Sequence, residues 1–516
     1  MSGLPTLNSR ASGVLFHPTS LPGPLGIGNL GPAAHRFAEL LASAGQSWWQ
    51  MLPVAPPVNG NSPYTAVSAF AGNPLLVSLE KLAEDGLLRA DEIPPYKDFV
   101  AGRVRYAAVW KHRAPRLRKA YERFRSRSRP SARDGFEEFC ALNEDWLPDY
   151  SMFAALKGAD HGRSWAQWNS DVRRRKPDAL RDVERTMTED IGYHKFAQYA
   201  FFKQWNELKL ACEEKGIGLI GDIPIYVARE SADVWANQDI FDLDPDGRPA
   251  FTAGVPPDYF SRTGQLWGNP LYRWGTLRER GYDWWLSRLK RMFERFDAVR
   301  LDHFIGFQRY YRVPRGERTA ERGEWVDGPG ADFFEKVLGA LGKAQIFVED
   351  LGVVTKDVMA LRDEFGFPGI KILLFAFGTD DFAESYLPHN HSKNCVVYTG
   401  THDNDTVVGW FEDPGGGRST RTRRQAAREK ERALNYLGSD GREINWDMIK
   451  AALRSVGNTA IIPVQDLLGL GSEGRMNRPA TVRGNWEWRL AEGDLDDEVV
   501  DRFRSLTSKY GRVPKG

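Results

Sequence analysis

The chain contains eight short apolar runs, and each of them ends in glycine, proline or a cluster of polar residues. The runs are residues 13–16, 48–52, 217–223, 298–301, 344–348, 370–375, 395–398 and 459–463. Longer amphipathic stretches, such as residues 284–296 and 333–341, lie between several of them. Strands that alternate with helices predict a parallel sheet, and eight such strands favour a closed (β/α)8 TIM barrel. Periodicity alone leaves an open doubly wound sheet as the alternative, because short apolar runs are ambiguous.

The interval between the second and third runs, residues 73–216, is far too long for a single crossover helix. Its polar, amphipathic stretches at residues 106–126 and 193–215 predict helices. We therefore expect a mostly α-helical insertion subdomain at residues 73–216, packed on the rim of the barrel. Residues 1–72 would supply the first two strands, and residues 217–516 the rest of the catalytic barrel with its active-site loops.

The charge of the chain argues against nucleic acid or a membrane as its partner. The 516 residues include 70 Lys and Arg against 69 Asp and Glu, a formal net charge of +1. This balance provides no overall field for binding a polyanion or an anionic membrane surface. The basic stretches at residues 113–133 and 418–424 are more typical of solvated helix surfaces than of a nucleic-acid site. We therefore expect a neutral small molecule or polymer as the ligand.

Signals for export and for disulfide bonding are weak. Residues 1–10 lack a basic start followed by an apolar core, and no apolar run approaches the roughly 18 residues that cross a bilayer. We therefore expect the protein in the cytoplasm. The three cysteines, Cys140, Cys212 and Cys395, are widely spaced, which favours free thiols over a disulfide framework or a zinc cluster.

Polar, ionisable residues follow five of the predicted strands. In a (β/α)8 barrel the carboxyl ends of the strands hold the active site, so these side chains are expected to converge on one pocket. Each of them alone is more often a turn or helix-cap residue than a catalytic one, but their joint recurrence favours a site. The residues are Asp222, Asp302, Glu349 with Asp350, His402 with Asp403, and Gln465 with Asp466.

Two carboxylates have the spacing that glycosidic chemistry requires. Arg300 and Asp302 stand two residues apart on the fourth strand, so both side chains point to one face. The guanidinium favours the ionised carboxylate, which a nucleophile needs. Glu349 ends the next strand, and adjacent barrel strands can bring two carboxyl groups to the roughly 5 Å separation of a retaining glycosidase. Without Glu349, a structural Arg–Asp pair would be the preferred interpretation.

The segments around these residues resemble those of a known family. Arg-Leu-Asp-His-Phe surrounds Asp302, Val-Glu-Asp-Leu-Gly surrounds Glu349, and Gly-Thr-His-Asp-Asn-Asp-Thr surrounds Asp403. These segments look like the catalytic motifs of the α-amylase superfamily, and most like its amylomaltase branch, the 4-α-glucanotransferases or disproportionating enzymes. The likeness continues, in the same order, through nearly the whole chain. It includes residues 16–31, 61–74, 221–226, 254–274 and 465–477.

The resemblance implies roles for the acidic residues. Asp302 would be the nucleophile, Glu349 the general acid and base, and Asp403 the carboxylate that grips sugar hydroxyls in the distorted transition state. Asp222 matches a position near the same pocket, where a structural role remains an equal alternative. Asp350 and Asp405 are predicted to be helix caps.

The resemblance also implies residues that bind the glucan chain. His303 and His402 would hydrogen-bond the sugar of the innermost donor subsite, and Arg300 would orient Asp302. The stretch at residues 254–274, which looks too irregular for helix or strand, resembles a loop that overhangs the active cleft. Aromatic faces in it can stack on sugar rings. The further binding residues are Gln265 and Trp267 with Tyr259 and Phe260 from that stretch, Ser62 and Tyr64 from the second barrel loop, and Asn477 near the last strand.

The expected activity is transfer of α-1,4-glucan segments to glucose or maltooligosaccharide acceptors by retaining double displacement, without a cofactor or a catalytic metal. One alternative is a hydrolase of the same superfamily, and a less favoured one is a non-catalytic glucan-binding protein. Some relatives carry an aromatic residue before Ser-Pro-Tyr for an outlying glucan patch, whereas this chain has Asn59 and Gly60, so a secondary site there is in doubt.

Overall fold

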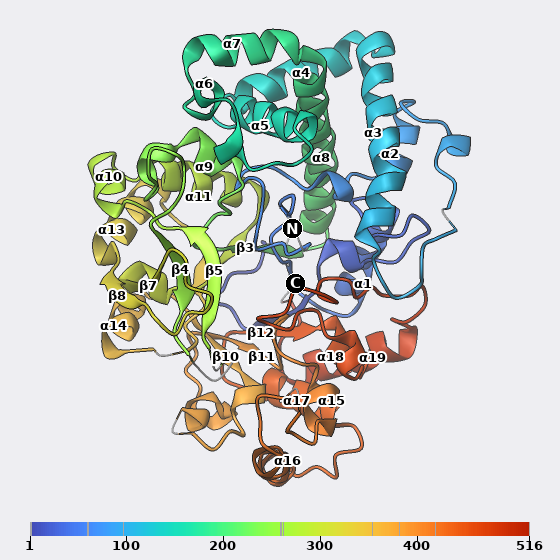
Figure 1. The fold of residues 1–516 in the computed structure, drawn as a ribbon. Coiled ribbons are helices and arrows are strands. Elements are labelled where there is room, and N and C mark those ends of the chain that lie inside the picture. Colours follow the sequence, from blue (N-terminus) through green and yellow to red (C-terminus); the bar gives the residue numbers. More distant parts are fainter. Residues whose placement is uncertain are drawn as a thin grey trace.

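The computed structural model describes residues 3–58, 61–95, 97–257, 261, 263–352, 354–380, 382–417 and 419–514. Within these parts of the chain, eight parallel strands close into a barrel at the centre of the molecule (Figure 1). Each predicted apolar run contains or overlaps one of these strands, so the predicted (β/α)8 barrel is confirmed. The strands are β1 (Ala11–Leu15), β2 (Trp48–Gln50), β3 (Gly218–Ile223), β6 (Ala298–Leu301), β9 (Ile346–Val348), β10 (Gly369–Ile372), β11 (Cys395–Tyr398) and β12 (Thr459–Pro463).

The order around the barrel is β1-β12-β11-β10-β9-β6-β3-β2. The strand residues are almost all buried, because one face packs inside the barrel and the other packs under helices. This explains why the runs are mostly apolar and do not alternate. The register pairs Asp222 with Arg300 and Leu301 with Val348, which brings the carboxyl ends of β3, β6 and β9 to the same level.

Helices between the strands surround the barrel (Figure 1). The longer ones are α1 (Pro32–Ser43), α11 (Asp283–Arg295), α13 (Gly330–Leu341), α14 (Lys356–Glu364), α16 (Arg423–Leu437), α17 (Ile444–Arg454) and α19 (Asp497–Lys509), and the shorter ones are α9 (Ala232–Ala236), α10 (Trp274–Glu279), α12 (Ile305–Gln308), α15 (Val407–Glu412) and α18 (Val464–Leu467). In α1, the buried residues Ala34, Phe37, Ala38 and Leu41 recur at helical spacing and form one apolar face. None of the described helices is long and apolar enough to cross a membrane.

The described residues between β2 and β3 form helices and no strand. These helices are α2 (Leu79–Glu84), α3 (Tyr106–Arg127), α4 (Pro130–Leu142), α5 (Leu147–Ala159), α6 (Ser170–Arg173), α7 (Pro177–Thr186) and α8 (Thr188–Glu214). In α8, the ring centroid of Phe196 lies 5.7 Å from that of Tyr121 in α3. The ring centroid of Trp205, also in α8, lies 5.1 Å from that of Phe296 beside the barrel. The helix α8 therefore joins the inserted helices to the barrel. The limits of the insertion subdomain at residues 73 and 216 remain a prediction.

A second sheet, which the sequence did not predict, stands beside the barrel. It is antiparallel, with the order β5-β4-β7-β8, and consists of β4 (Phe251–Val255), β5 (Gln265–Pro270), β7 (Arg309–Pro314) and β8 (Glu324–Asp327). The interpretation of residues 254–274 as wholly irregular was therefore wrong. These strands are only partly buried, so their sequences lack the apolar runs of the barrel. The pairing of β4 with β5 also shifts in register between Thr252 and Gly254.

Candidate active site

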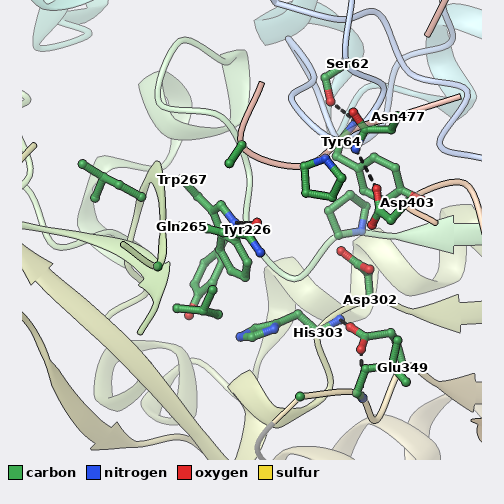
Figure 2. Close-up of a pocket in the computed structure, with 18 of the residues that line it drawn as sticks. Ser62, Tyr64, Tyr226, Gln265, Trp267, Asp302, His303, Glu349, Asp403 and Asn477 are labelled. Carbon is green, nitrogen blue, oxygen red and sulfur yellow. Dashed lines mark hydrogen bonds between the residues drawn. The ribbon is translucent and has the colours of Figure 1, made fainter. Parts of the chain in front are cut away.

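An open cavity of about 720 Å³ lies at the carboxyl ends of the barrel strands, where (β/α)8 proteins carry their active sites (Figure 2). Eleven of the twelve predicted site residues that the structure describes line it. They are Ser62, Tyr64, Gln265, Trp267, Arg300, Asp302, His303, Glu349, His402, Asp403 and Asn477. The twelfth, Asp222, lies outside the lining.

Asp302 and Glu349 stand next to each other because β6 and β9 are neighbouring strands. Leu301 pairs with Val348 in the parallel register, so the residue that follows each strand faces its counterpart across one strand spacing of about 4.8 Å. The Glu349 carboxyl accepts backbone N–H bonds from His303 at 2.8 Å and from Leu351 at 2.9 Å. These bonds fix the direction of the carboxyl group toward Asp302 (Figure 2).

The environment of Glu349 favours its protonated form. Burial raises the pKa of Glu349 to about 8, and the Asp302 carboxylate reinforces this effect, although Arg300 opposes it. At neutral pH the side chain therefore carries a proton that it can donate. The protonated Glu349 and the Asp302 carboxyl group thus lie together at the edge of an open cavity. This is the arrangement expected of the acid and the nucleophile of a retaining glycosidase.

Arg300 holds Asp302 in place from inside the barrel. Its Nη1 lies 2.7 Å from Asp302 Oδ1 and 2.8 and 2.9 Å from the two oxygens of Asp222. Burial lowers the pKa of Arg300, but the two carboxylates offset this effect and raise the pKa above its ordinary value. Asp222, for which a substrate contact and a structural role were equal alternatives, is buried behind Arg300 and accepts a bond of 2.7 Å from the hydroxyl of Tyr64. Its carboxylate is occupied by these partners, because β3 ends directly beside β6.

Asp403 carries the third carboxylate of the cavity. Asn477 Nδ2 donates to its Oδ1 at 2.6 Å, and His402 Nε2 lies 3.4 Å from its Oδ2. Burial alone would raise the pKa of Asp403, but His402 and Asn477 hold it well below its ordinary range. The Tyr64 ring stacks on His402, with ring centroids 4.9 Å apart, and fixes the plane of the imidazole. Asp403 is therefore ionised at neutral pH and held in one orientation.

The opposite wall of the cavity comes from the β4–β5 hairpin. Trp267 Nε1 donates to Gln265 Oε1 at 3.2 Å. The Trp267 ring also contacts the His303 ring edge to face, with ring centroids 4.7 Å apart. His303 has a φ of 53°, a left-handed backbone conformation that turns its side chain away from Asp302 and toward Trp267 (Figure 2). Burial lowers the pKa of His303 to about 4, and its Nε2 has no hydrogen-bond partner among the described residues. This nitrogen is also buried from solvent.

Several other residues that the sequence singled out at strand ends lie away from the cavity. Asp466 accepts the backbone N–H of Val407 at 2.8 Å, and together with Gln465 it lines a much smaller internal space. Asp350 binds the backbone of Ile370 and the side chain of Arg362, so it joins two strands and caps no helix. Asp405 is not a cap either, because Thr406 provides the N-cap of α15. The predicted contacts Tyr259 and Phe260 lie outside the described residues.

The cavity has further lining residues that the sequence analysis did not single out. Trp325 comes from β8, and Val482 and Trp486 come from the segment after β12. No motif marks them, since an isolated aromatic residue is more often part of a core, and only the position of the second sheet brings Trp325 to the cavity. Among the described residues, no group of three His, Cys, Asp or Glu side chains could hold a metal ion.

Comparison with known proteins agrees with this geometry. Residues 16–495 match a protein family described as 4-alpha-glucanotransferase. A 4-alpha-glucanotransferase from Synechocystis sp. is 47% identical over 513 residues, 98% of this chain and 99% of the relative. One from Thermus thermophilus is 44% identical over 512 residues, with the same shares of both chains. The structure of amylomaltase from Streptococcus agalactiae in complex with acarbose aligns with a TM-score of 0.92 at 36% identity, and covers 98% of this chain and 100% of that one. This chain belongs to the 4-alpha-glucanotransferase family.

Proposed function

We propose that this protein is a 4-α-glucanotransferase that cleaves an α-1,4 bond in a glucan and transfers the segment to glucose or a maltooligosaccharide. The observation that carries the proposal is the pair of neighbouring carboxyl groups at the cavity. Asp302 is bound to Arg300, whereas burial raises the pKa of Glu349 to about 8. A carboxyl group that keeps its proton, beside a second one that is paired with a guanidinium, is what a retaining mechanism needs.

In the first step, Glu349 donates its proton to the glycosidic oxygen while Asp302 attacks the anomeric carbon. The bond from the anomeric carbon to that oxygen breaks, the shortened chain leaves with the proton, and a covalent glucosyl ester forms on Asp302. In the second step, Glu349, now a carboxylate, takes a proton from the acceptor hydroxyl. The acceptor oxygen then attacks the anomeric carbon and releases Asp302, so the anomeric configuration is retained.

The remaining lining residues would bind the sugar chain. Asp403, oriented by Asn477 and His402, accepts bonds from hydroxyls of the sugar at the reacting carbon. Trp267 offers an apolar face, and His303 beside it lines the same wall and is proposed to bond a hydroxyl. A neutral, hydroxyl-rich chain suits such a wall better than an ionic ligand does. The other residues proposed to bind sugar are Ser62, Tyr64 and Gln265.

Transfer is proposed to outcompete hydrolysis. After glycosylation, Glu349 could activate water as readily as a sugar hydroxyl, so selection has to come from acceptor binding. Bulk water is present at about 55 M, and an effective molarity of about 10⁵ M for a held acceptor would favour transfer by about three orders of magnitude. The apolar walls around Trp267 and Trp325 are where an acceptor ring would be held.

Incubation with maltotriose tests the proposal. We expect glucose together with a ladder of longer maltooligosaccharides, while the total of reducing ends stays nearly constant. A steady rise in reducing ends without longer products would indicate a hydrolase, and binding without any product would indicate a non-catalytic protein. The predicted insertion limits at residues 73 and 216 and the cytoplasmic location also remain predictions.

A further inference from the structure

Arg475 connects the two segments that carry Asp403 and Asn477. It follows β12 along the chain, after a short turn at Ser472–Gly474. Its Nη2 donates to the backbone carbonyl of Asp403 at 2.7 Å, and its Nε donates to the backbone carbonyl of Asn477 at 2.7 Å. Arg475 is not among the residues that line the 720 Å³ cavity, and its side chain is 20% exposed. It therefore acts on these two residues from behind the site.

The two residues that Arg475 holds also bind each other on the cavity side. Asn477 Nδ2 donates to the Asp403 carboxylate at 2.6 Å (Figure 2), and the Asn477 backbone N–H donates to the carbonyl of His402 at 3.0 Å. A guanidinium is planar, and its donors diverge in a fixed geometry. One side chain that bonds both carbonyls therefore fixes the separation of the two backbones, and with it the direction of the carboxylate.

A third contact holds the guanidinium itself. Arg475 Nη1 lies 3.5 Å from Asp405 Oδ2, and the hydroxyl of Ser472 donates to the same oxygen at 2.8 Å. Asp405 precedes the N-cap of α15, so it is attached to an ordered helix. Burial lowers the pKa of Arg475, and Asp405 partly offsets this effect. Asp405, which does not line the 720 Å³ cavity, therefore helps to keep the Arg475 guanidinium charged.

We propose that Arg475 is a positioning residue for the reaction, acting through Asn477 and Asp403. The inference rests on the proposed function, in which Asp403 binds hydroxyls of the distorted sugar. Such contacts gain most of their value in the transition state, so a displaced carboxylate slows turnover more than it weakens binding. An error of about 1 Å in the position of a catalytic group costs on the order of a hundredfold in rate.

The test compares Arg475→Met, Arg475→Lys and a control, Arg442→Met, in the full chain. Arg442 is 88% exposed and pairs only weakly with Asp440, so its loss should leave the rate within about twofold of wild type. With maltotriose, Arg475→Met should lower kcat roughly a hundredfold and change KM far less. Arg475→Lys keeps the charge beside Asp405 but cannot bond both carbonyls in the same geometry, so it should recover only part of kcat. Thermal melting of each variant verifies that it is folded.

A double-mutant cycle with Asn477→Ala separates positioning from general loss of structure. If Arg475 acts through Asn477, Arg475→Met should slow the Asn477→Ala enzyme far less than it slows wild type. Losses that multiply, or a kcat of Arg475→Met equal to that of wild type, would overturn the inference. If kcat is measured as the rate at which maltotriose is consumed, the comparison also applies when wild type passes the glucan to water. A wild type that makes no longer products contradicts the proposed transfer and leaves this comparison intact, whereas a wild type that cleaves nothing contradicts both.

Discussion

Replacing Glu349 by glutamine should change how the stability of the protein depends on pH. Burial, reinforced by Asp302, raises the pKa of Glu349 from 4.5 to about 8 in the folded chain. An unfolded chain has no such environment, so the folded protein loses stability as the pH rises from 4.5 through 8 and Glu349 is forced to ionise. Glutamine has the same shape and cannot ionise. The substitution should therefore remove this loss.

The magnitude follows from the pKa and from the hydrogen bonds of Glu349. A tenfold change in proton affinity is worth about 1.4 kcal/mol, so a pKa raised from 4.5 to about 8 corresponds to at most about 5 kcal/mol at high pH. The amide has one acceptor oxygen for the two N–H groups of His303 and Leu351, and one lost bond costs about 1 kcal/mol at every pH. The unfolding entropy converts a difference in stability into a shift of Tm. About 2.1 cal/mol/K per residue gives about 1.1 kcal/mol/K for 516 residues.

These values predict nearly equal Tm for wild type and Glu349→Gln at about pH 5, and a Tm about 3 °C higher for the variant at about pH 8.5. Differential scanning calorimetry at both pH values measures the difference. Glu364→Gln is the control, because Glu364 is exposed on α14 and should show no such dependence on pH. A Tm difference that is the same at both pH values, or a variant that is less stable at high pH, would refute the reasoning.

Four further predictions concern single residues. Asp302→Ala should abolish turnover and leave glucan binding largely intact, as measured by calorimetric titration, because the carboxylate forms the covalent bond; activity within tenfold of wild type would contradict the assignment. Glu349→Gln should slow glycosylation by maltotriose far more than by a glucosyl fluoride, whose leaving group needs little protonation; equal impairment in the first step would exclude the acid role. Trp267→Ala should raise the share of hydrolysis, seen as an increase in reducing ends per transfer, because an apolar wall for the acceptor is lost; an unchanged share would exclude Trp267 from acceptor selection. Arg512→Met should lower the free energy of unfolding, measured in urea, by about 3 kcal/mol or more. The reason is that the fully buried guanidinium donates to five backbone carbonyls, those of Ala11, Leu453, Ser455, Gly457 and Asn458. A loss below about 1 kcal/mol would contradict this.

The barrel could be predicted because its strands are buried on both faces. A run such as residues 459–463 is therefore mostly apolar, and it ends where the chain leaves the core, so the sequence alone locates the strand. The antiparallel sheet could not be predicted in the same way. In β5, Leu266 is 38% exposed while Asn269 is buried, and this pattern has no simple period. Pairing with β4 decides that this segment is a strand, and pairing is a tertiary property.

By itself, the sequence predicted which residues meet at the cavity, and only the tertiary structure decided what surrounds them. Asp302 and Glu349 could be identified because each ends a buried strand, and parallel strands in a barrel meet at one end. The protonation of Glu349 depends on desolvation and on the distance to Asp302, and neither is visible along the chain. Asp222 illustrates the same limit: its position near the end of a strand was clear, but its partners Arg300 and Tyr64 come from distant segments and keep it out of the cavity. Local sequence patterns fix burial and chain direction, whereas electrostatic environment depends on residues that only folding brings together.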